Sequence, residues 1–232
     1  MKIVIFGADG ATGRHAVKLA CSAGDDVVAV EHHLPDDRHG PDTLVWKEAD
    51  VLSDDLGPIV AGADAVLSCL GVGNDPSTLA DPPPLYTQGT ERIMAAMKQE
   101  RIDRLIVISA TFVETLERGP LWFRLPAAIG LARVFAQMKE MERLLAADPS
   151  INWTAVRPGW LMEGDLTDDY VVVADAIPED TIRTRHADLA HFMLSLAESG
   201  DWSRAYPAIA RVEADDKTSL AEVLEEVASS SQ

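Results

Sequence analysis

The feature that most constrains this chain is a group of three glycines, Gly7, Gly10 and Gly13, set between a short apolar run and a helical pattern. Residues 2–6 are rich in β-branched side chains, which is typical of a strand buried on both faces of a parallel sheet. Residues 14–23 place small apolar side chains on one face of a helix. The opening of the chain therefore predicts a strand, a glycine turn and a helix.

A second apolar strand is expected at residues 27–30, ending at Glu31. In such a unit Gly7 permits the sharp turn, Gly10 lets the backbone approach a pyrophosphate, and Gly13 lets helix and strand pack closely. The helix N-terminus then faces the phosphates, and an acid at the tip of the second strand accepts hydrogen bonds from a ribose hydroxyl. The pattern predicts dinucleotide binding by Gly7, Asp9, Gly10, Ala11, Thr12, Gly13, Arg14, Glu31 and His32.

The Gly-x-x-Gly-x-x-Gly spacing resembles the extended and atypical branches of the short-chain dehydrogenase/reductase superfamily. The resemblance implies an α/β fold of the Rossmann type, a doubly wound parallel sheet with strand order 3-2-1-4-5-6. We expect one domain over residues 1–232 with a small C-terminal extension on the substrate side. The substrate-side elements are expected mainly within 110–126 and 159–186.

Hydrophobic patterning places the other elements of this fold. The prolines of residues 74–84 argue against a helix in that loop. Further strands are expected at 43–47, 63–70, 104–108, 152–157, 170–173 and 204–209, and helices at 54–61, 85–100, 127–147, 187–199 and 220–228.

Two further groups are expected at the cofactor. By the resemblance, Asp50 accepts from the adenine amino group and Val51 packs on the ring, whereas a helix-capping role fits Ser53 better. Small residues end the strand at 63–70, where the ligands of open α/β sheets lie. There we expect Cys69, Leu70 and Gly71 at the cofactor.

The catalytic residues of the superfamily are present here only in part. The resemblance implies that Ser109 contacts the substrate and that a Tyr-x-x-x-Lys pair lies on the following helix. This chain has Phe135 and Lys139 at that spacing, so the usual acid is absent. We expect Lys139 to hold the nicotinamide ribose and to pair with Glu142, three residues on. For Phe135, core packing and a direct ligand contact both remain open.

An Arg-Pro-Gly turn follows the strand at 152–157 and is typical of the same branches. By that match Pro158 and Gly159 line the nicotinamide site. Trp160 is placed to stack on a flat acceptor, with core packing as the alternative, and Thr111 is also expected to face the acceptor. His186 and Asp188 begin a helix and are expected to be structural.

The missing tyrosine favours an NAD(P)H-dependent reductase whose acceptor needs no acid from the protein, such as a flavin or a quinone. The alternative is an NmrA-like sensor that binds nucleotide without turnover. An isomerase or dehydratase is a weaker third possibility. NADH is favoured over NADPH because Glu31 repels a 2′-phosphate, although Arg14 would offset this if it turned toward the ribose.

Composition excludes several classes of partner. A net charge of −18 argues against nucleic acid and against anionic membranes. The histidines after the second strand lack a ligand spacing for a metal. The two cysteines, Cys21 and Cys69, fit reduced thiols in a cytoplasmic protein without a signal peptide. We expect a small-molecule partner and a monomer or homodimer.

Overall fold

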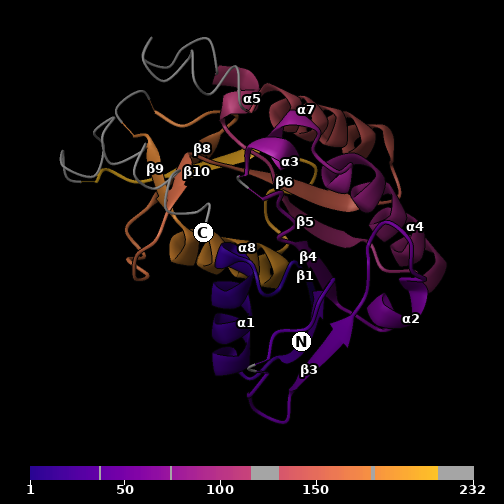
Figure 1. The fold of residues 1–232 in the computed structure, drawn as a ribbon. Helices are drawn as coiled ribbons and strands as arrows, with labels where there is room; N and C mark the ends of the chain where they lie inside the picture. Colours follow the sequence, from indigo (N-terminus) through magenta and orange to yellow (C-terminus); the bar gives the residue numbers. More distant parts are fainter. Residues whose placement is uncertain (37, 74, 116–130, 179–180, 214–232) are drawn as a thin grey trace.

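The computed structural model describes residues 1–36, 38–73, 75–115, 131–178 and 181–213 (Figure 1). The strands are β1 (Lys2–Phe6), β2 (Asp26–Glu31), β3 (Leu44–Glu48), β4 (Ala65–Ser68), β5 (Arg104–Ile108), β6 (Asn152–Pro158), β7 (Trp160–Met162), β8 (Val171–Ala174), β9 (Arg183–Arg185) and β10 (Pro207–Ala210). The helices are α1 (Ala11–Ala23), α2 (Gly57–Val60), α3 (Pro76–Ala80), α4 (Thr90–Glu100), α5 (Phe112–Thr115), α7 (Ala132–Ala147) and α8 (His186–Ser199), with a π-helical turn η1 (Leu85–Gly89).

Eight of the described strands form one large sheet in the order β3-β2-β1-β4-β5-β6-β10-β8. The predicted order 3-2-1-4-5-6 is confirmed, and these six strands are parallel, with Ile3 of β1 opposite Val27 of β2 and Ala65 of β4. β10 continues the parallel order beside β6, and β8 closes the edge in the antiparallel direction. A separate pair, β7 and β9, follows the end of β6. The predicted C-terminal extension thus adds strands to the sheet.

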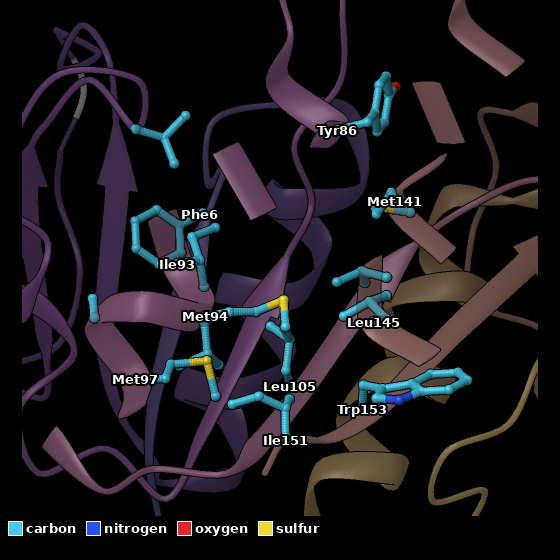
Figure 2. Close-up of a cluster of buried hydrophobic side chains, with 14 of the residues drawn as sticks. Phe6, Tyr86, Ile93, Met94, Met97, Leu105, Met141, Leu145, Ile151 and Trp153 are labelled. Atoms are coloured by element: carbon cyan, nitrogen blue, oxygen red, sulfur yellow. The ribbon is translucent and has the colours of Figure 1, made fainter. Parts of the chain in front are cut away.

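Two apolar layers cover the sheet. On one face, α1 and α8 pack side by side against the strands, with Ala16 and Ala20 of α1 in the same buried cluster as Leu189 and Met193 of α8 (Figure 1). On the other face, α2, α4 and α7 close a second cluster, part of which is drawn in Figure 2. Both layers surround strands that are almost wholly buried, as the continuous apolar runs in the sequence predicted.

The expectation of no helix in residues 74–84 is wrong, because α3 lies there. Pro76 occupies the beginning of the helix, where its missing N–H has no partner to lose. The Asp75 carboxylate caps the helix by accepting a hydrogen bond of 3.0 Å from the backbone N–H of Thr78. A proline at this position begins a helix instead of preventing one.

Other helices have boundaries that differ from the predicted ones. The helix expected at 54–61 is limited to the single turn of α2, and the helix expected at 85–100 begins as the π-helical turn η1. The short elements α5, β7 and β9 were not predicted. Of the expected helix at 127–147, residues 127–130 lie outside the described residues, as does the expected helix at 220–228.

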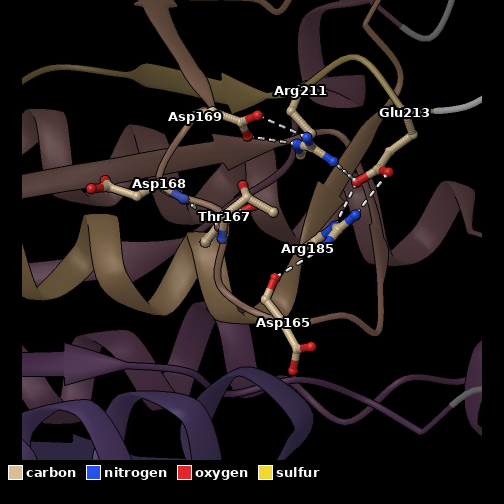
Figure 3. Close-up of polar contacts among 8 residues, drawn as sticks. Asp165, Thr167, Asp168, Asp169, Arg185, Arg211 and Glu213 are labelled. Atoms are coloured by element: carbon tan, nitrogen blue, oxygen red, sulfur yellow. Dashed lines mark hydrogen bonds and ion pairs between the residues drawn. The ribbon is translucent and has the colours of Figure 1, made fainter.

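A polar network fixes the segment between β7 and β8 (Figure 3). Arg211 makes two hydrogen bonds of 2.9 Å to the Asp169 carboxylate and one of 2.7 Å to Glu213. Arg185 binds the Glu213 carboxylate at 2.6 and 3.0 Å and donates to the backbone oxygen of Asp165. These bonds join the ends of β9 and β10 to the segment that follows β7. No described helix is long and apolar enough to cross a membrane.

Candidate functional site

A cavity of about 1150 Å³ crosses the carboxyl ends of the parallel strands, from β2 to β6. This volume exceeds the roughly 300–1,000 Å³ of a pocket for one small ligand. Most residues predicted at the cofactor or the acceptor line it. They are Gly7, Asp9, Gly10, Ala11, Thr12, Glu31, His32, Asp50, Val51, Cys69, Leu70, Gly71, Ser109, Phe135, Pro158, Gly159 and Trp160.

The glycine turn has the geometry that its sequence predicts. Gly7 has φ +71°, and a Cβ there would lie 2.7 Å from the backbone oxygen of Cys69. A Cβ on Gly13 would lie 2.0 Å from the oxygen of Gly7, so α1 packs directly against the turn and Gly13 lies beneath the cavity. The first turn of α1 has no acidic side chain, and its free amides can meet an anion.

Glu31 stands at the tip of β2 and is held in place. Its carboxylate accepts hydrogen bonds from the backbone N–H of Asp9, at 2.8 Å, and of His32, at 3.2 Å. Arg14 does not line the cavity, because its guanidinium pairs with the Asp9 carboxylate at 2.8 Å and is largely exposed. That pairing raises the pKa of Arg14. Arg14 is therefore placed beside the ribose end of the cavity but engaged with Asp9.

Asp50 lines the cavity and also caps a turn, a role that the sequence pattern predicts for Ser53. Its carboxylate accepts from the backbone N–H of Leu52 at 2.8 Å and from the Ser53 hydroxyl at 3.0 Å. The Leu52 hydrogen bond is the main reason that the pKa of Asp50 is lowered. Ser53 acts as a donor to Asp50, so the capping expectation for Ser53 is wrong.

The end of β4 forms the floor of the cavity with Cys69, Leu70 and Gly71. Burial raises the pKa of the Cys69 thiol to about 12, with a further contribution from the charge of Glu31. The thiol is therefore protonated at neutral pH, and Cys69 acts as a small apolar side chain.

Ser109, at the end of β5, is buried and bound to a charge pair. Its hydroxyl donates to the Glu142 carboxylate at 2.7 Å. Arg157 donates two hydrogen bonds, of 2.9 and 2.7 Å, to the same carboxylate. Burial lowers the pKa of Arg157, but the hydrogen bonds and charge of Glu142 outweigh it, and the net shift is upward. The Ser109 proton is thus directed at Glu142.

The face of α7 that lines the cavity carries Val134, Phe135 and Met138. Lys139 does not line it and is exposed on the helix surface. The expected pairing of Lys139 with Glu142 is also wrong, because Glu142 is buried beside Arg157. One residue turns a helix by about 100°, so Met138 takes the place that we expected for the lysine.

Thr111 was expected to face the acceptor but does not line the cavity. It is fully buried, and its hydroxyl accepts a hydrogen bond of 3.2 Å from the backbone N–H of Ile177. The residue that lines the cavity after Ala110 is Phe112, whose ring centroid lies 5.9 Å from that of Phe135 and 6.3 Å from that of Trp160. Three aromatic rings therefore meet at the end of the cavity away from Glu31.

Asp188 has the structural role that we expected. Its carboxylate holds the segment after β7 by accepting hydrogen bonds from the backbone N–H and the hydroxyl of Thr167, at 2.8 and 2.9 Å. His186, also expected to be structural, lines the cavity and is 2.8 Å from Thr12, from Nδ1 to Oγ1. Sequence reasoning missed it because the first residue of α8 reaches the N-terminus of α1 only through tertiary packing.

Tyr86 and Leu85 are lining residues that the sequence analysis also missed. They belong to the π-helical turn η1, which continues into α4 and reads as ordinary helix in the sequence. A wider first turn changes which side chains face the cavity, and the sequence pattern gave no sign of it.

The described residues fit a nicotinamide dinucleotide. Gly10 lines the cavity and leaves only backbone where a side chain would block a pyrophosphate, while Gly7 and Gly13 allow the tight turn and the close packing of α1. Glu31 and Asp50 lie at one end of the cavity, and Pro158, Gly159 and Trp160 lie at the other. This order of groups follows a dinucleotide from its adenosine to its nicotinamide half.

A family model described as NAD(P)H-binding matches residues 7–199. Among solved structures, a proposed NADH-flavin reductase from Streptococcus pneumoniae is 19% identical, with a TM-score of 0.72 over 91% of this chain and 99% of that chain. A proposed epimerase from Bacteroides thetaiotaomicron is 21% identical, with a TM-score of 0.76 over 92% and 98%. A short-chain dehydrogenase/reductase from Veillonella parvula, in complex with NADP, is 14% identical, with a TM-score of 0.73 over 90% and 94%.

Proposed function

Because the chain belongs to the NAD(P)H-binding family of atypical short-chain dehydrogenases/reductases, we propose that it is an NAD(P)H-dependent reductase. In this proposal it passes hydride to a flat acceptor such as a flavin or a quinone. The protein binds and orients both partners, and solvent supplies the proton that the reduced acceptor needs.

The observation that carries this proposal is that the lining side chains of α7 and of the end of β5 offer no available proton donor. Phe135 and Met138 have no proton to give, Lys139 faces away, and the Ser109 hydrogen is held by Glu142. Reduction of an ordinary carbonyl needs an acid beside the oxygen that gains charge. A flavin or quinone spreads that charge over a conjugated ring system and needs no such acid on this wall.

The lining residues divide into two working parts. The glycine turn and the N-terminus of α1 hold the pyrophosphate, Glu31 holds the ribose, and Val51 packs on the adenine. When bound, the reduced nicotinamide supplies the hydride. Phe112, Phe135 and Trp160 form the flat, apolar surfaces on which a planar acceptor stacks.

We further propose that NADH is preferred over NADPH. The Glu31 carboxylate is fixed at the ribose end of the cavity by the Asp9 N–H, and Arg14 is engaged with Asp9. A 2′-phosphate would meet a fixed negative charge before it met a free cation.

The test is to follow NADH and NADPH oxidation by the purified protein with riboflavin, FMN, menadione and a set of small aldehydes and ketones. We expect turnover with the flat acceptors and none with the small carbonyls. Turnover confined to small carbonyls would overturn the proposal.

The second candidate function is a sensor that binds dinucleotide without turnover. The exposed position of Lys139 favours it, because the cavity then has no lysine from α7 at the nicotinamide ribose. Absence of turnover together with tighter binding of one redox state of the nucleotide, measured by calorimetry, would select the sensor.

A further inference from the structure

Tyr86 is a polar side chain in the apolar part of the cavity wall. It lies on η1, which packs against α7, and it belongs to the same buried cluster as Phe112, Phe135 and Met138. Figure 2 shows its ring at the margin of the cluster, with the hydroxyl directed away from the other labelled core side chains. Its neighbours in the lining from the same segment, Leu79, Pro83 and Leu85, offer no polar side-chain atom.

The Tyr86 hydroxyl lies beside the backbone that follows β4. A Cβ built on Gly71 would be 3.9 Å from Oη, and the backbone of Val72 makes a hydrogen bond to it. Both Gly71 and Val72 line the cavity. Since a tyrosine oxygen accepts and donates, a bond from the Val72 N–H leaves the phenolic hydrogen for another partner. Within the described part of the chain no acceptor is paired with that hydrogen.

The phenol is a donor at working pH. Burial raises the pKa of Tyr86 to about 12, and the Val72 hydrogen bond offsets only part of that increase. A buried tyrosine hydroxyl normally finds a hydrogen-bond partner. Val72 is its partner as an acceptor, and the partner for the phenolic hydrogen is expected from the ligand.

On the wall formed by α7 and the end of β5, the lining side chains of Val134, Phe135 and Met138 have no polar hydrogen, and the Ser109 hydrogen is committed to Glu142. Resting on the reductase function above, we propose that Tyr86 Oη donates a hydrogen bond to a carbonyl oxygen of the bound acceptor. Tyr86 is thus a binding residue that favours flat acceptors with a carbonyl group, such as flavins and quinones, over flat acceptors without one.

The test is Tyr86→Phe, which removes the hydroxyl and keeps the ring. We expect kcat/KM for riboflavin and menadione to fall about 3- to 10-fold, the effect of one neutral hydrogen bond. With methylene blue, a flat acceptor without a carbonyl oxygen, the rate above the uncatalysed background should be unchanged. The dissociation constant for NADH should also be unchanged.

The matched control is Tyr170→Phe. The Tyr170 hydroxyl lies 2.8 Å from His191 Nδ1, and Tyr170 does not line the cavity. This variant should keep the wild-type kinetics with all three acceptors. An equal loss with methylene blue in Tyr86→Phe, or no loss with riboflavin and menadione, would overturn the role of Tyr86.

Riboflavin binding separates this proposal from the reductase function. Quenching of riboflavin fluorescence by the protein and NAD⁺ gives a dissociation constant without turnover. If the wild type binds riboflavin but does not reduce it, the reductase function fails, and a 3- to 10-fold weaker riboflavin complex in Tyr86→Phe still supports the hydrogen bond. An unchanged complex, or no riboflavin complex in the wild type, overturns the proposal for Tyr86.

Discussion

At the scale of single residues, the site depends on groups whose hydrogen bonds are already made within the protein. Glu31, Asp50 and Ser109 each have protein partners that fix their orientation. Such preorganisation lowers the cost of ordering the site when a ligand binds. It also fixes which side of each polar group a ligand meets, as the direction of the Ser109 hydroxyl shows.

Glu31 gives the sharpest prediction at this scale. In Glu31→Gln the fixed negative charge is removed while the side-chain length is kept, so the dissociation constant for NADPH should fall relative to that for NADH by about 5- to 10-fold. This corresponds to roughly 1 kcal/mol of charge repulsion at a partly solvated site. Fluorescence titration of both nucleotides measures it.

Glu48 is the matched control for Glu31. It lies opposite Glu31 in β3, is exposed and does not line the cavity. Glu48→Gln should leave the ratio of the two dissociation constants unchanged. An equal shift in both variants would mean that only the overall charge of the protein is being sensed.

The turn at Gly7 and the close packing at Gly13 were predicted correctly because both are local. Gly7 and Gly13 are required by contacts within one strand-turn-helix unit, and the sequence contains that unit whole. Lys139 and Thr111 were placed wrongly because their orientation depends on how a helix or loop is rotated against the sheet. If a helix is rotated by the angle of one residue, about 100°, a side chain moves from the cavity to the solvent or to the interior.

At the scale of elements, Glu142 joins α7 to the strands below it. Its carboxylate is bound by Arg157 of β6 and by Ser109 at the end of β5. Glu142 and Arg157 are both buried, so loss of Glu142 leaves Arg157 with only the longer ion pair to Glu114, at 3.5 Å. The pair therefore ties the orientation of the α7 face that lines the cavity to the ends of two strands.

Glu142→Ala should lower the free energy of unfolding by about 3 kcal/mol, because the buried Arg157 would lose its two short hydrogen bonds to Glu142 and keep only the longer ion pair with Glu114, at 3.5 Å. Urea unfolding followed by circular dichroism measures the change. The double variant Glu142→Met with Arg157→Met should recover part of the loss. A double variant less stable than Glu142→Ala would contradict this account.

The network after β7 predicts a pH dependence. Hydrogen bonds from Arg185 are the main reason that the pKa of Glu213 is lowered from 4.5 to about 2, and Arg211 lowers that of Asp169 to about 2. These carboxylates are favoured in the folded state, so their stabilisation is fully present above about pH 4.5. It is lost as the pH falls through the range down to 2.

In Glu213→Gln the melting temperature should be lower at pH 7, and it should fall less steeply between pH 4.5 and pH 3 than in the wild type. Differential scanning calorimetry across this range measures both. Glu198→Gln, at an exposed position near the end of α8, is the control and should follow the wild type. Parallel curves for Glu213→Gln and the wild type would exclude the network as the cause.

Comparison of the predicted and observed elements shows which of them the hydrophobic pattern can predict. Most of the parallel strands were predicted because a buried strand is a continuous apolar run, whereas β3 lies at the edge of the sheet and is partly exposed. α3 was missed because Pro76 was taken as a breaker when it begins a helix. β7 and β9 are three residues each, too short for a period to show, and they form only because the end of β6 brings them together.

At the scale of the whole molecule, charge is the dominant property. The chain has 38 acidic and 20 basic residues. Mutual repulsion among the acidic groups opposes the compact state and is screened by salt within a few ångströms at high ionic strength.

Raising sodium chloride from about 10 mM to 0.5 M should therefore raise the melting temperature. A gain of about 1 kcal/mol corresponds to about 2–4 °C for a domain of this size. Potassium chloride should act equally, because screening depends on ionic strength. A melting temperature that stays constant or falls would show that local ion pairs outweigh the repulsion.

The packing of α1 against α8 determines when α1 can gain its native contacts during synthesis. α1 is completed at Ala23, whereas the helix that covers it begins at His186. On the ribosome α1 can pack against β1 and β2 early, but the part of its apolar surface that contacts α8 has no native cover until most of the described chain has been synthesised. The dinucleotide-binding end is thus translated early but completed late, and a fragment that ends before α8 should not bind the nucleotide.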